Sequence, residues 1–333
     1  MPRGIPLPIP FPSRISPDID RADAVHLEWP RHFGLIATDE AARRHADARY
    51  AELAARFHPA AAGADLDLGV DQMSWYFLFD DLFDGPIGAD PTAVEPLIAE
   101  MKRVLSIHPE KLLPPAGPPL AHAFHDMWVR CCVGMSVVWR RRAMLHWHEY
   151  LDGYVEEARI VAAGRIPEVE DHLRLRRATV GVQPTLDLAE RIGYFEVPVA
   201  LFYSPTMTTM RNIAAEVDAL HNDICSLEKE RSIGDVHNIM IILQRTRGWT
   251  EQHALEASIH MIGRRTLEYS RLESGLADLY DTLDLNEDDR KAGDQYARNA
   301  LRTVMRGDYD WAEGSGRYDT DRELMPGGGD HGR

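Results

Sequence analysis

Residues 73–84 read Met-Ser-Trp-Tyr-Phe-Leu-Phe-Asp-Asp-Leu-Phe-Asp, an apolar and aromatic run that ends in three aspartates. Apolar side chains recur back to residue 66, and Gly85-Pro86 follows the run. The helical spacing, with no alternating strand pattern, predicts a helix over residues 66–83 that the glycine and proline end. We therefore expect an apolar helix whose C-terminal end carries concentrated negative charge.

The three aspartates at this helix end are Asp80, Asp81 and Asp84. On one helix, positions 80 and 84 lie one turn apart on the same face, with Asp81 next to them. Their charges repel one another, and the negative end of the helix dipole adds to the repulsion. A hard divalent cation, Mg²⁺ above all, is the expected counter-charge. The alternative is a solvated acidic helix end, and the adjacent aromatic residues argue against it because such ends seldom carry several large rings.

A second group of oxygen ligands lies in residues 221–230, His-Asn-Asp-Ile-Cys-Ser-Leu-Glu-Lys-Glu. Asn222, Ser226 and Glu230 are four residues apart and therefore point along one stripe of a predicted helix. Their amide, hydroxyl and carboxylate oxygens suit Mg²⁺, which takes its remaining ligands from water and phosphate. Lys229 lies among them and is a candidate phosphate ligand. Two such stripes on separate helices predict a site that holds a diphosphate and Mg²⁺ between them.

Helical patterns cover most of the remaining chain, and no fixed repeat or linker divides it. We predict an all-α, single-domain helical bundle around a central cavity, spanning residues 1–333. Residues 1–16 form a proline-rich N-terminal segment, and residues 325–333 a flexible tail. The predicted helices cover about residues 39–57, 66–83, 91–108, 120–135, 137–163, 169–180, 186–192, 197–204, 207–231, 236–246, 251–280 and 287–311.

The composition argues against several classes of function. The formal charge of −16 argues against a nucleic-acid partner, because a phosphate backbone needs a basic stripe to bind. Three cysteines in 333 residues do not make a disulfide framework, which favours a reduced, cytoplasmic environment. There is no signal-peptide pattern and no run of eighteen apolar residues, so we expect no membrane span.

The paired motifs resemble those of class I terpene synthases. In that family an aspartate-rich motif and an Asn-Asp-x-x-Ser-x-x-x-Glu triad bind three Mg²⁺ ions and the substrate diphosphate. The resemblance implies the all-α class I terpenoid synthase fold, with Asp80, Asp81, Asp84, Asn222, Ser226 and Glu230 as metal ligands. Similarity to bacterial sesquiterpene cyclases extends over most of the chain, through stretches such as residues 63–71, 79–86, 179–190 and 316–319.

The resemblance also implies which residues sense the diphosphate. Arg176 lies 46 residues before Asn222, which is the family's spacing for a diphosphate-sensing arginine. Its neighbour Arg177 competes for that role. Thr179 and Val180 then match the linker and effector positions of the family's induced-fit switch.

Two further segments complete the implied diphosphate site. Arg317 and Tyr318 resemble the C-terminal Arg-Tyr pair that donates to the diphosphate when the site closes. Lys229 is the remaining candidate donor. Guanidinium, ammonium and phenol donors stabilise the charge that develops on a departing diphosphate, so these residue types suit the ionisation step.

The cavity should be apolar and dry, because a carbocation must cyclise before water traps it. Candidate aromatic walls are Phe77, Tyr76, Trp311 and Phe57, each able to stabilise a passing cation by roughly 0.5–2 kcal/mol. The alternative for each ring is plain core packing. The resemblance implies farnesyl diphosphate as substrate and 1,11-closure to a humulyl-type cation. Tyr76 stands where the family pattern has Phe, and Ala312 where it has His, which leaves the product open between hydrocarbons and alcohols.

Two other functions are compatible with the helical pattern. A chain-elongating prenyltransferase would carry a second aspartate-rich motif, and here the Asn222, Ser226 and Glu230 triad takes its place. A non-catalytic prenyl diphosphate-binding protein or helical scaffold would release no diphosphate. A monomer and a homodimer are both compatible with the sequence, and the cyclase is favoured.

Overall fold

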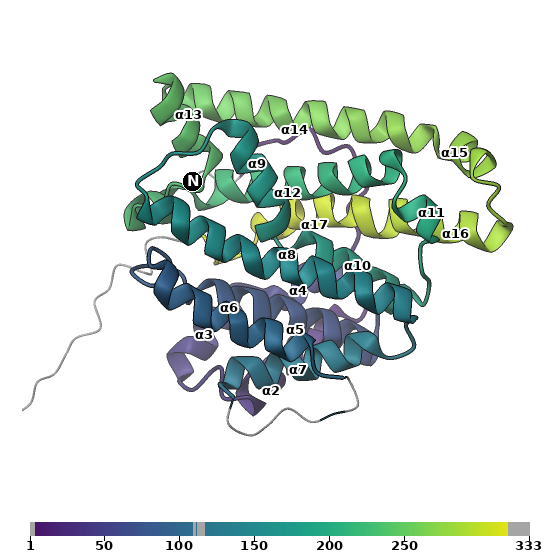
Figure 1. Ribbon diagram of the computed structural model, residues 1–333, viewed down its shortest axis with the longest axis horizontal. Helices are drawn as coiled ribbons and strands as arrows, with labels where there is room; N and C mark the ends of the chain where they lie inside the picture. The colour runs from purple at the N-terminus through teal and green to yellow at the C-terminus, as the bar shows by residue number, and fades with distance from the viewer. Residues whose placement is uncertain (1–3, 109–110, 112–116, 319–333) are drawn as a thin grey trace, which may run out of the picture.

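Helices make up all the regular secondary structure in the residues that the computed structural model describes, which are 4–108, 111 and 117–318 (Figure 1). This confirms the all-α prediction. In chain order the helices are α1 (Ile19–Val25), α2 (Glu28–His32), α3 (Asp39–Asp47), α4 (Tyr50–Phe57), α5 (Gly63–Asp80), α6 (Pro91–Leu105), α7 (Pro119–Cys132), α8 (Val137–Ala162), α9 (Val169–Thr179), α10 (Val182–Gly193), α11 (Val199–Phe202), α12 (Pro205–Ile233), α13 (Ile239–Arg247), α14 (Glu251–Ser274), α15 (Leu276–Thr282), α16 (Glu287–Tyr296) and α17 (Arg302–Ala312).

The helices pack as a layered bundle. In Figure 1, α8 crosses the middle of the view, with α5, α6 and α7 on one side and α12, α14 and α17 on the other. Helix α4 packs against both α5 and α17, and α12 packs against α9, α14 and α17. The two helices that carry the predicted ligand stripes, α5 and α12, therefore belong to opposite sides of the bundle. Within the described residues, no helix is long and apolar enough to cross a membrane.

Helix α5 is buried on nearly every side, which explains its aromatic sequence. Trp75 stacks on Phe79 and on Phe124 of α7, with ring centroids 4.6 and 4.5 Å apart, and meets Trp147 of α8 edge to face at 5.5 Å. Such ring pairs add to the free energy that burial of the apolar surface contributes. The packing therefore holds the C-terminal end of α5, and Asp80 with it, against α8.

The prediction that Asp80 and Asp84 share one helical face is wrong. Helix α5 ends at Asp80, and tight turns follow, because the Phe83 amide bonds back to the Asp80 carbonyl (2.9 Å) over three residues. Gly85, with φ of +114°, then turns the chain in a backbone conformation that a side chain would disfavour. Asp84 thus lies on a loop and meets α12 instead of extending α5.

Three predicted helices are interrupted. The segment 39–57 breaks at Arg49, whose left-handed φ of 58° separates α3 from α4. Gly275 separates α14 from α15, and a π-helical turn at Ala297–Leu301 joins α16 to α17. Each break redirects a helix that has to follow the curved surface of the bundle, which local helix propensity does not report.

The proline-rich N-terminal segment packs on the bundle where it is described. Ile9 and Phe11 are buried, and the Thr266 hydroxyl of α14 donates to the Pro8 carbonyl at 2.8 Å. The N-terminal residues therefore contribute to the core next to α14. The predicted tail at residues 325–333 lies outside the described residues.

One buried histidine predicts a pH dependence of stability. His58 is buried beside Gly69 and Ala54, and burial lowers its pKa to about 4 from the ordinary 6.5. Between these values the unfolded chain binds a proton that the folded protein does not. The free energy of unfolding should therefore fall by about 3 kcal/mol from this group as the pH drops from 6.5 to 4.

Urea unfolding of the wild type and of a His58→Leu variant across this pH range measures the effect. The variant should show a shallower fall in stability, by about 3 kcal/mol. Equal slopes for the two proteins would mean that His58 does not contribute.

Candidate functional site

A cavity between α5 and α12 brings half of the predicted site residues together. Asp80 borders it on α5 and Asn222 on α12, and Arg176 of α9 and Tyr318 of the C-terminal segment also line it. The walls contain Phe57 together with the neighbouring aromatic residues of α5. The structure therefore contains the central cavity that the sequence predicts. Its walls are partly apolar, and the four polar residues just named come from four different segments.

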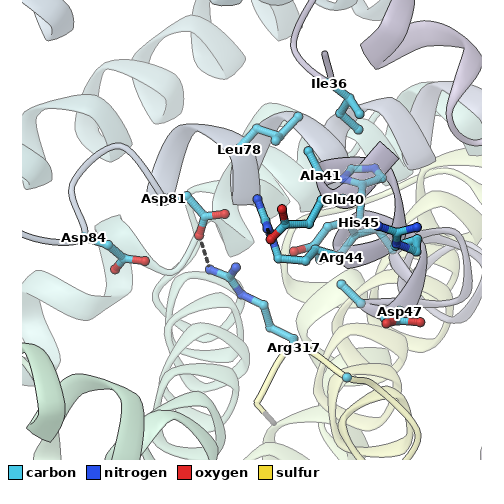
Figure 2. Close-up of a pocket in the computed structure, with 14 residues that line it drawn as sticks. Ile36, Glu40, Ala41, Arg44, His45, Asp47, Leu78, Asp81, Asp84 and Arg317 are labelled. Carbon is cyan, nitrogen blue, oxygen red and sulfur yellow. Dashed lines mark hydrogen bonds and ion pairs between the residues drawn. The ribbon is translucent and has the colours of Figure 1, made fainter. Parts of the chain in front are cut away.

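The aspartate segment pairs with two cations from distant parts of the chain. Arg317 donates to Asp81 at 2.6 Å and lies 3.5 Å from Asp80 (Figure 2). Lys229 of α12 lies 2.6 Å from Asp84 and 3.9 Å from Asp81. These cations offset the repulsion among the carboxylates. Both cations are predicted diphosphate donors, so the acidic and basic parts of the predicted site meet.

Asp84 is partly removed from water by these contacts. Burial raises its pKa, the Lys229 ammonium lowers it, and repulsion from Asp80 and Asp81 raises it further. Figure 2 shows that Asp84 lies apart from the Arg317–Asp81 pair. A cation that bound between these carboxylates would therefore compete with the Lys229 ammonium and the Arg317 guanidinium, which already pair with them.

The predicted triad lies along α12 as its spacing requires. The Asn222 side chain connects two other predicted residues, because its Oδ1 accepts from Arg176 at 2.7 Å and its Nδ2 donates to the Tyr318 hydroxyl at 3.0 Å. One turn later the Ser226 hydroxyl donates to the Asn222 carbonyl at 2.8 Å. After another turn, Glu230 accepts from Asn238 at 2.8 Å.

The donor chemistry of the triad fits a hard cation. Burial raises the pKa of Glu230 to about 8, and the carboxylates of Asp223 and Asp235 raise it too, while Arg176 opposes the rise. A cation at this carboxylate would favour its ionised form. Within residues 4–108, 111 and 117–318, no three His, Cys, Asp or Glu side chains converge into a metal site. A metal ion here would accordingly need amide, hydroxyl, water or phosphate oxygens as well.

The structure separates Arg176 from Arg177. Arg176 points inward, where it bonds Asn222 and lies 3.2 Å from the buried Asp223 carboxylate. Arg177 points to the other side of α9 and pairs with Glu216 at 2.6 Å. Of the two arginines, therefore, Arg176 is the one that borders the cavity.

A break between α9 and α10 lies beside Arg176. Thr179 and Val180 line the cavity there, and Gly181 has a left-handed φ of +79°. The Tyr76 hydroxyl donates to the Gly181 carbonyl at 3.0 Å, and a side chain at Gly181 would meet the Tyr76 ring at 3.3 Å. Tyr76 thus connects the aromatic wall to the turn that follows Thr179 and Val180, the predicted linker and effector positions.

The four candidate aromatic residues fall into two groups. Phe57, Tyr76 and Phe77 line the cavity. Phe77 also stacks on Tyr50, with centroids 4.3 Å apart, and the Arg317 guanidinium lies 5.1 Å from its ring. Trp311 is fully buried behind them and is absent from the cavity lining, so its described contacts are those of a core residue.

Trp311 belongs to the anchor of the C-terminal segment. Its indole nitrogen donates to the carbonyl of Ala48 at 2.9 Å, and Ser315 donates to the same carbonyl at 2.9 Å. The Gly316 amide bonds the Asp47 carbonyl at 2.8 Å, and a Cβ on Gly316 would lie 2.9 Å from that oxygen. The α3–α4 junction therefore holds the residues that immediately precede Arg317 and Tyr318.

Besides Thr185, sequence reasoning missed two tyrosines and two aspartates that line the cavity. Tyr154 donates to Asp80 at 3.2 Å and shares a hydrogen bond with Tyr150 at 2.9 Å. Asp218 and Asp308 also line the cavity. The spacing of Tyr150 and Tyr154 by one turn places them on one face of α8, but it does not show that this face meets Asp80.

A Tyr76→Phe variant tests the link to the helix break. It should keep the ring and lose the bond to Gly181, which contributes about 1 kcal/mol to folding. We expect a small fall in the melting temperature and a changed set of reaction products, measured by thermal unfolding and mass spectrometry. A Tyr203→Phe variant on the exposed surface is the control, and identical behaviour of both variants would contradict the predicted role.

Comparisons with known proteins agree with this geometry. Residues 71–268 match the family model described as terpene synthase family 2, C-terminal metal binding. The chain is 47% identical to a pentalenene synthase of Streptomyces avermitilis, over 96% of this chain and 95% of the relative. It is 39% identical to a (−)-β-caryophyllene synthase of Saccharothrix espanaensis, which is described as cyclising (2E,6E)-farnesyl diphosphate, over 96% and 90%.

A solved structure is also similar. The linalool/nerolidol synthase of Streptomyces clavuligerus superposes with a TM-score of 0.83 at 34% identity, covering 92% of this chain and all of the other. The similarity covers nearly the whole chain, so it extends over both sides of the bundle.

Proposed function

The chain belongs to the terpene synthases and is a sesquiterpene cyclase, and from that premise we propose that it ionises farnesyl diphosphate with Mg²⁺ and cyclises the resulting cation. The observation that carries the proposal is the Asn222 side chain, which bonds both Arg176 and Tyr318 at the cavity. This contact places one predicted metal ligand between two predicted diphosphate donors.

The residues that would hold Mg²⁺ come from two walls. Asp80, Asp81 and Asp84 supply carboxylates on one side, and Asn222, Ser226 and Glu230 supply amide, hydroxyl and carboxylate oxygens on the other. We propose three ions, as the family resemblance implies. Bound Mg²⁺ would neutralise the diphosphate and favour its departure.

The chain's own donors would bind the diphosphate. Arg176 and Tyr318 lie at the cavity, while Lys229 and Arg317 are paired with the aspartates. A diphosphate that met these cations would exchange their carboxylate partners for phosphate oxygens. Donors placed around the leaving group before reaction stabilise the charge as the carbon–oxygen bond breaks.

The apolar wall would then direct cyclisation. Phe57, Tyr76 and Phe77 line the cavity, where their rings can stabilise cations and exclude water. We propose 1,11-closure to a humulyl-type cation, leading to pentalenene or a related sesquiterpene. Tyr76 and Ala312 depart from the family pattern, and of the two only Tyr76 is among the residues that line the cavity. We propose that the shape of the cavity decides which of these products forms.

An assay of product formation tests the proposal. Purified protein is incubated with geranyl, farnesyl or geranylgeranyl diphosphate and Mg²⁺, and diphosphate release and hydrocarbons are measured. Farnesyl diphosphate should give cyclic C15 products, and EDTA should abolish them. Elongated prenyl diphosphates on addition of isopentenyl diphosphate would indicate a prenyltransferase, and no release under any condition would indicate a binding protein.

Three further proposals accompany this function. We propose a cytoplasmic location, a single domain over residues 1–333 and a monomer or homodimer. Sedimentation analysis of the purified chain distinguishes the last two.

A further inference from the structure

A buried cluster of polar side chains borders the cavity on the side of α12 and α17. Asp218 and His221 lie one turn apart on α12, and Asp308 comes from α17. All three are at most 7% exposed. His221 Nδ1 makes a short hydrogen bond with Asp308 Oδ2, and its Nε2 lies 3.3 Å from Cys225 Sγ. Both carboxyl groups line the cavity.

The two carboxyl groups have different surroundings. Asp218 Oδ1 is buried and has no hydrogen-bond partner in the described part of the chain. Burial, and then repulsion from Asp308, raises the pKa of Asp218 well above its ordinary value, against the opposing charges of His221 and Arg176. Asp308 has the imidazole of His221 as its partner, which orients one of its oxygens at the cavity wall.

A buried carboxyl group costs stability unless it is hydrogen-bonded or paired, and Asp218 Oδ1 has no such partner among the described residues. The proposed reaction has a use for one, because a cyclised cation becomes a hydrocarbon only when a neighbouring C–H bond gives up its proton. Among the described side chains that line the cavity, carboxyl groups come from Asp80, Asp218 and Asp308, and Asp80 is a proposed metal ligand. Of the other two, Asp308 has a partner, His221, that holds one of its oxygens in place.

We propose that Asp308 is the proton acceptor that ends the cyclisation, with His221 as its positioning residue; this rests on the proposed cyclase function. A C–H bond next to the cationic carbon breaks, and its electron pair forms the new C=C bond. The proton passes to the Asp308 carboxylate, which becomes a neutral acid. The proton then leaves to the released diphosphate or to water, and the carboxylate is restored.

An Asp308→Asn variant tests the proposal because it keeps the shape and removes the acceptor. With farnesyl diphosphate and Mg²⁺, diphosphate release should stay near the wild-type rate, since ionisation takes place at the metal and arginine groups. The ratio of the main alkene to all other products should fall about tenfold or more, with alcohols and alkenes from other cations replacing it. Diphosphate release thus reports the proposed function, and the product ratio reports this inference.

Two matched variants sharpen the assignment. Asp310→Asn makes the same change two residues along α17, where the carboxylate pairs with Arg56 and Arg306 instead of lining the cavity, and should leave the ratio unchanged. Asp218→Asn changes the neighbouring carboxyl group. A larger fall in the ratio for Asp218→Asn than for Asp308→Asn would overturn the proposal, as would an unchanged ratio in Asp308→Asn.

Circular dichroism shows whether each variant is folded. If Asp308→Asn is not, Asp308→Glu keeps the charge and moves the carboxylate by one methylene. It should yield alkene isomers with the double bond at a neighbouring position. An unchanged product set from Asp308→Glu would also overturn the proposal.

Discussion

Replacing Asn222 with alanine is expected to lower the rate of diphosphate release from farnesyl diphosphate by about 10²- to 10³-fold, with the helical fold retained. The variant loses the amide that bonds both Arg176 and Tyr318, and with it one proposed metal ligand. Two donors then lose the partner that holds them at the cavity. Steady-state diphosphate release and circular dichroism measure the two properties.

A Ser232→Ala variant controls for substitution on the same helix. Ser232 is exposed near the C-terminal end of α12 and donates only to the Lys229 carbonyl among its described contacts. It should retain wild-type activity. Wild-type turnover in Asn222→Ala, measured beside this control, would contradict the assignment of the triad as metal ligands.

The second large effect is expected from Arg176→Lys. Arg176 reaches Asn222, Thr179 and Asp223 with different nitrogens of one planar group, and a single ammonium cannot reproduce that geometry. We expect diphosphate release to fall about 10²-fold. The melting temperature should also fall by a few degrees, because the buried Asp223 carboxylate loses part of its pairing.

Arg177→Lys is the matched control for this variant. It makes the same change one residue later, on the side of α9 that pairs with Glu216. Activity should stay within about twofold of wild type, since Arg177 does not line the cavity and the substitution keeps the positive charge beside Glu216. Equal losses in the two variants would show that α9 as a whole, and not the Arg176 guanidinium, is the sensitive feature.

The sequence was sufficient to predict the helical class and the α12 stripe. Asn222, Ser226 and Glu230 lie within one uninterrupted helix, so spacing by four residues translates directly into a shared face. The same rule was wrong for Asp80 and Asp84, because α5 ends between them. Helix termini depend on where a chain has to turn to meet its neighbours, and residue spacing does not report that.

Local sequence patterns could not predict the contacts between segments that lie far apart in the chain. Lys229 was predicted as a phosphate donor, but nothing local indicates that it meets Asp84, 145 residues earlier in the chain. Likewise Asp218 and Asp308 read as ordinary charged residues of helices. Only the packing of α12 against α17 brings both to the cavity.

The aromatic candidates show the same limit. Phe57, Tyr76 and Phe77 line the cavity, whereas Trp311 anchors the chain behind it. A large ring on a helix is buried in either case, so hydrophobicity alone does not separate a wall from a core. The distinction comes from tertiary packing, which brings three of the rings to the cavity and directs Trp311 to the Ala48 carbonyl.

The anchor at the α3–α4 junction has a consequence for ion competition. Because Ser315 and Gly316 are bonded to residues 47 and 48, Arg317 begins one residue from a fixed point and meets Asp81 as an intramolecular partner. A short tether of this kind gives an effective concentration of at least the order of millimolar. Dissolved monovalent cations must compete with the Arg317 guanidinium for Asp81. A cation that binds as a complex with an anion differs, because the anion can pair with Arg317 in place of Asp81. We therefore expect the aspartate segment to favour a cation that arrives together with diphosphate.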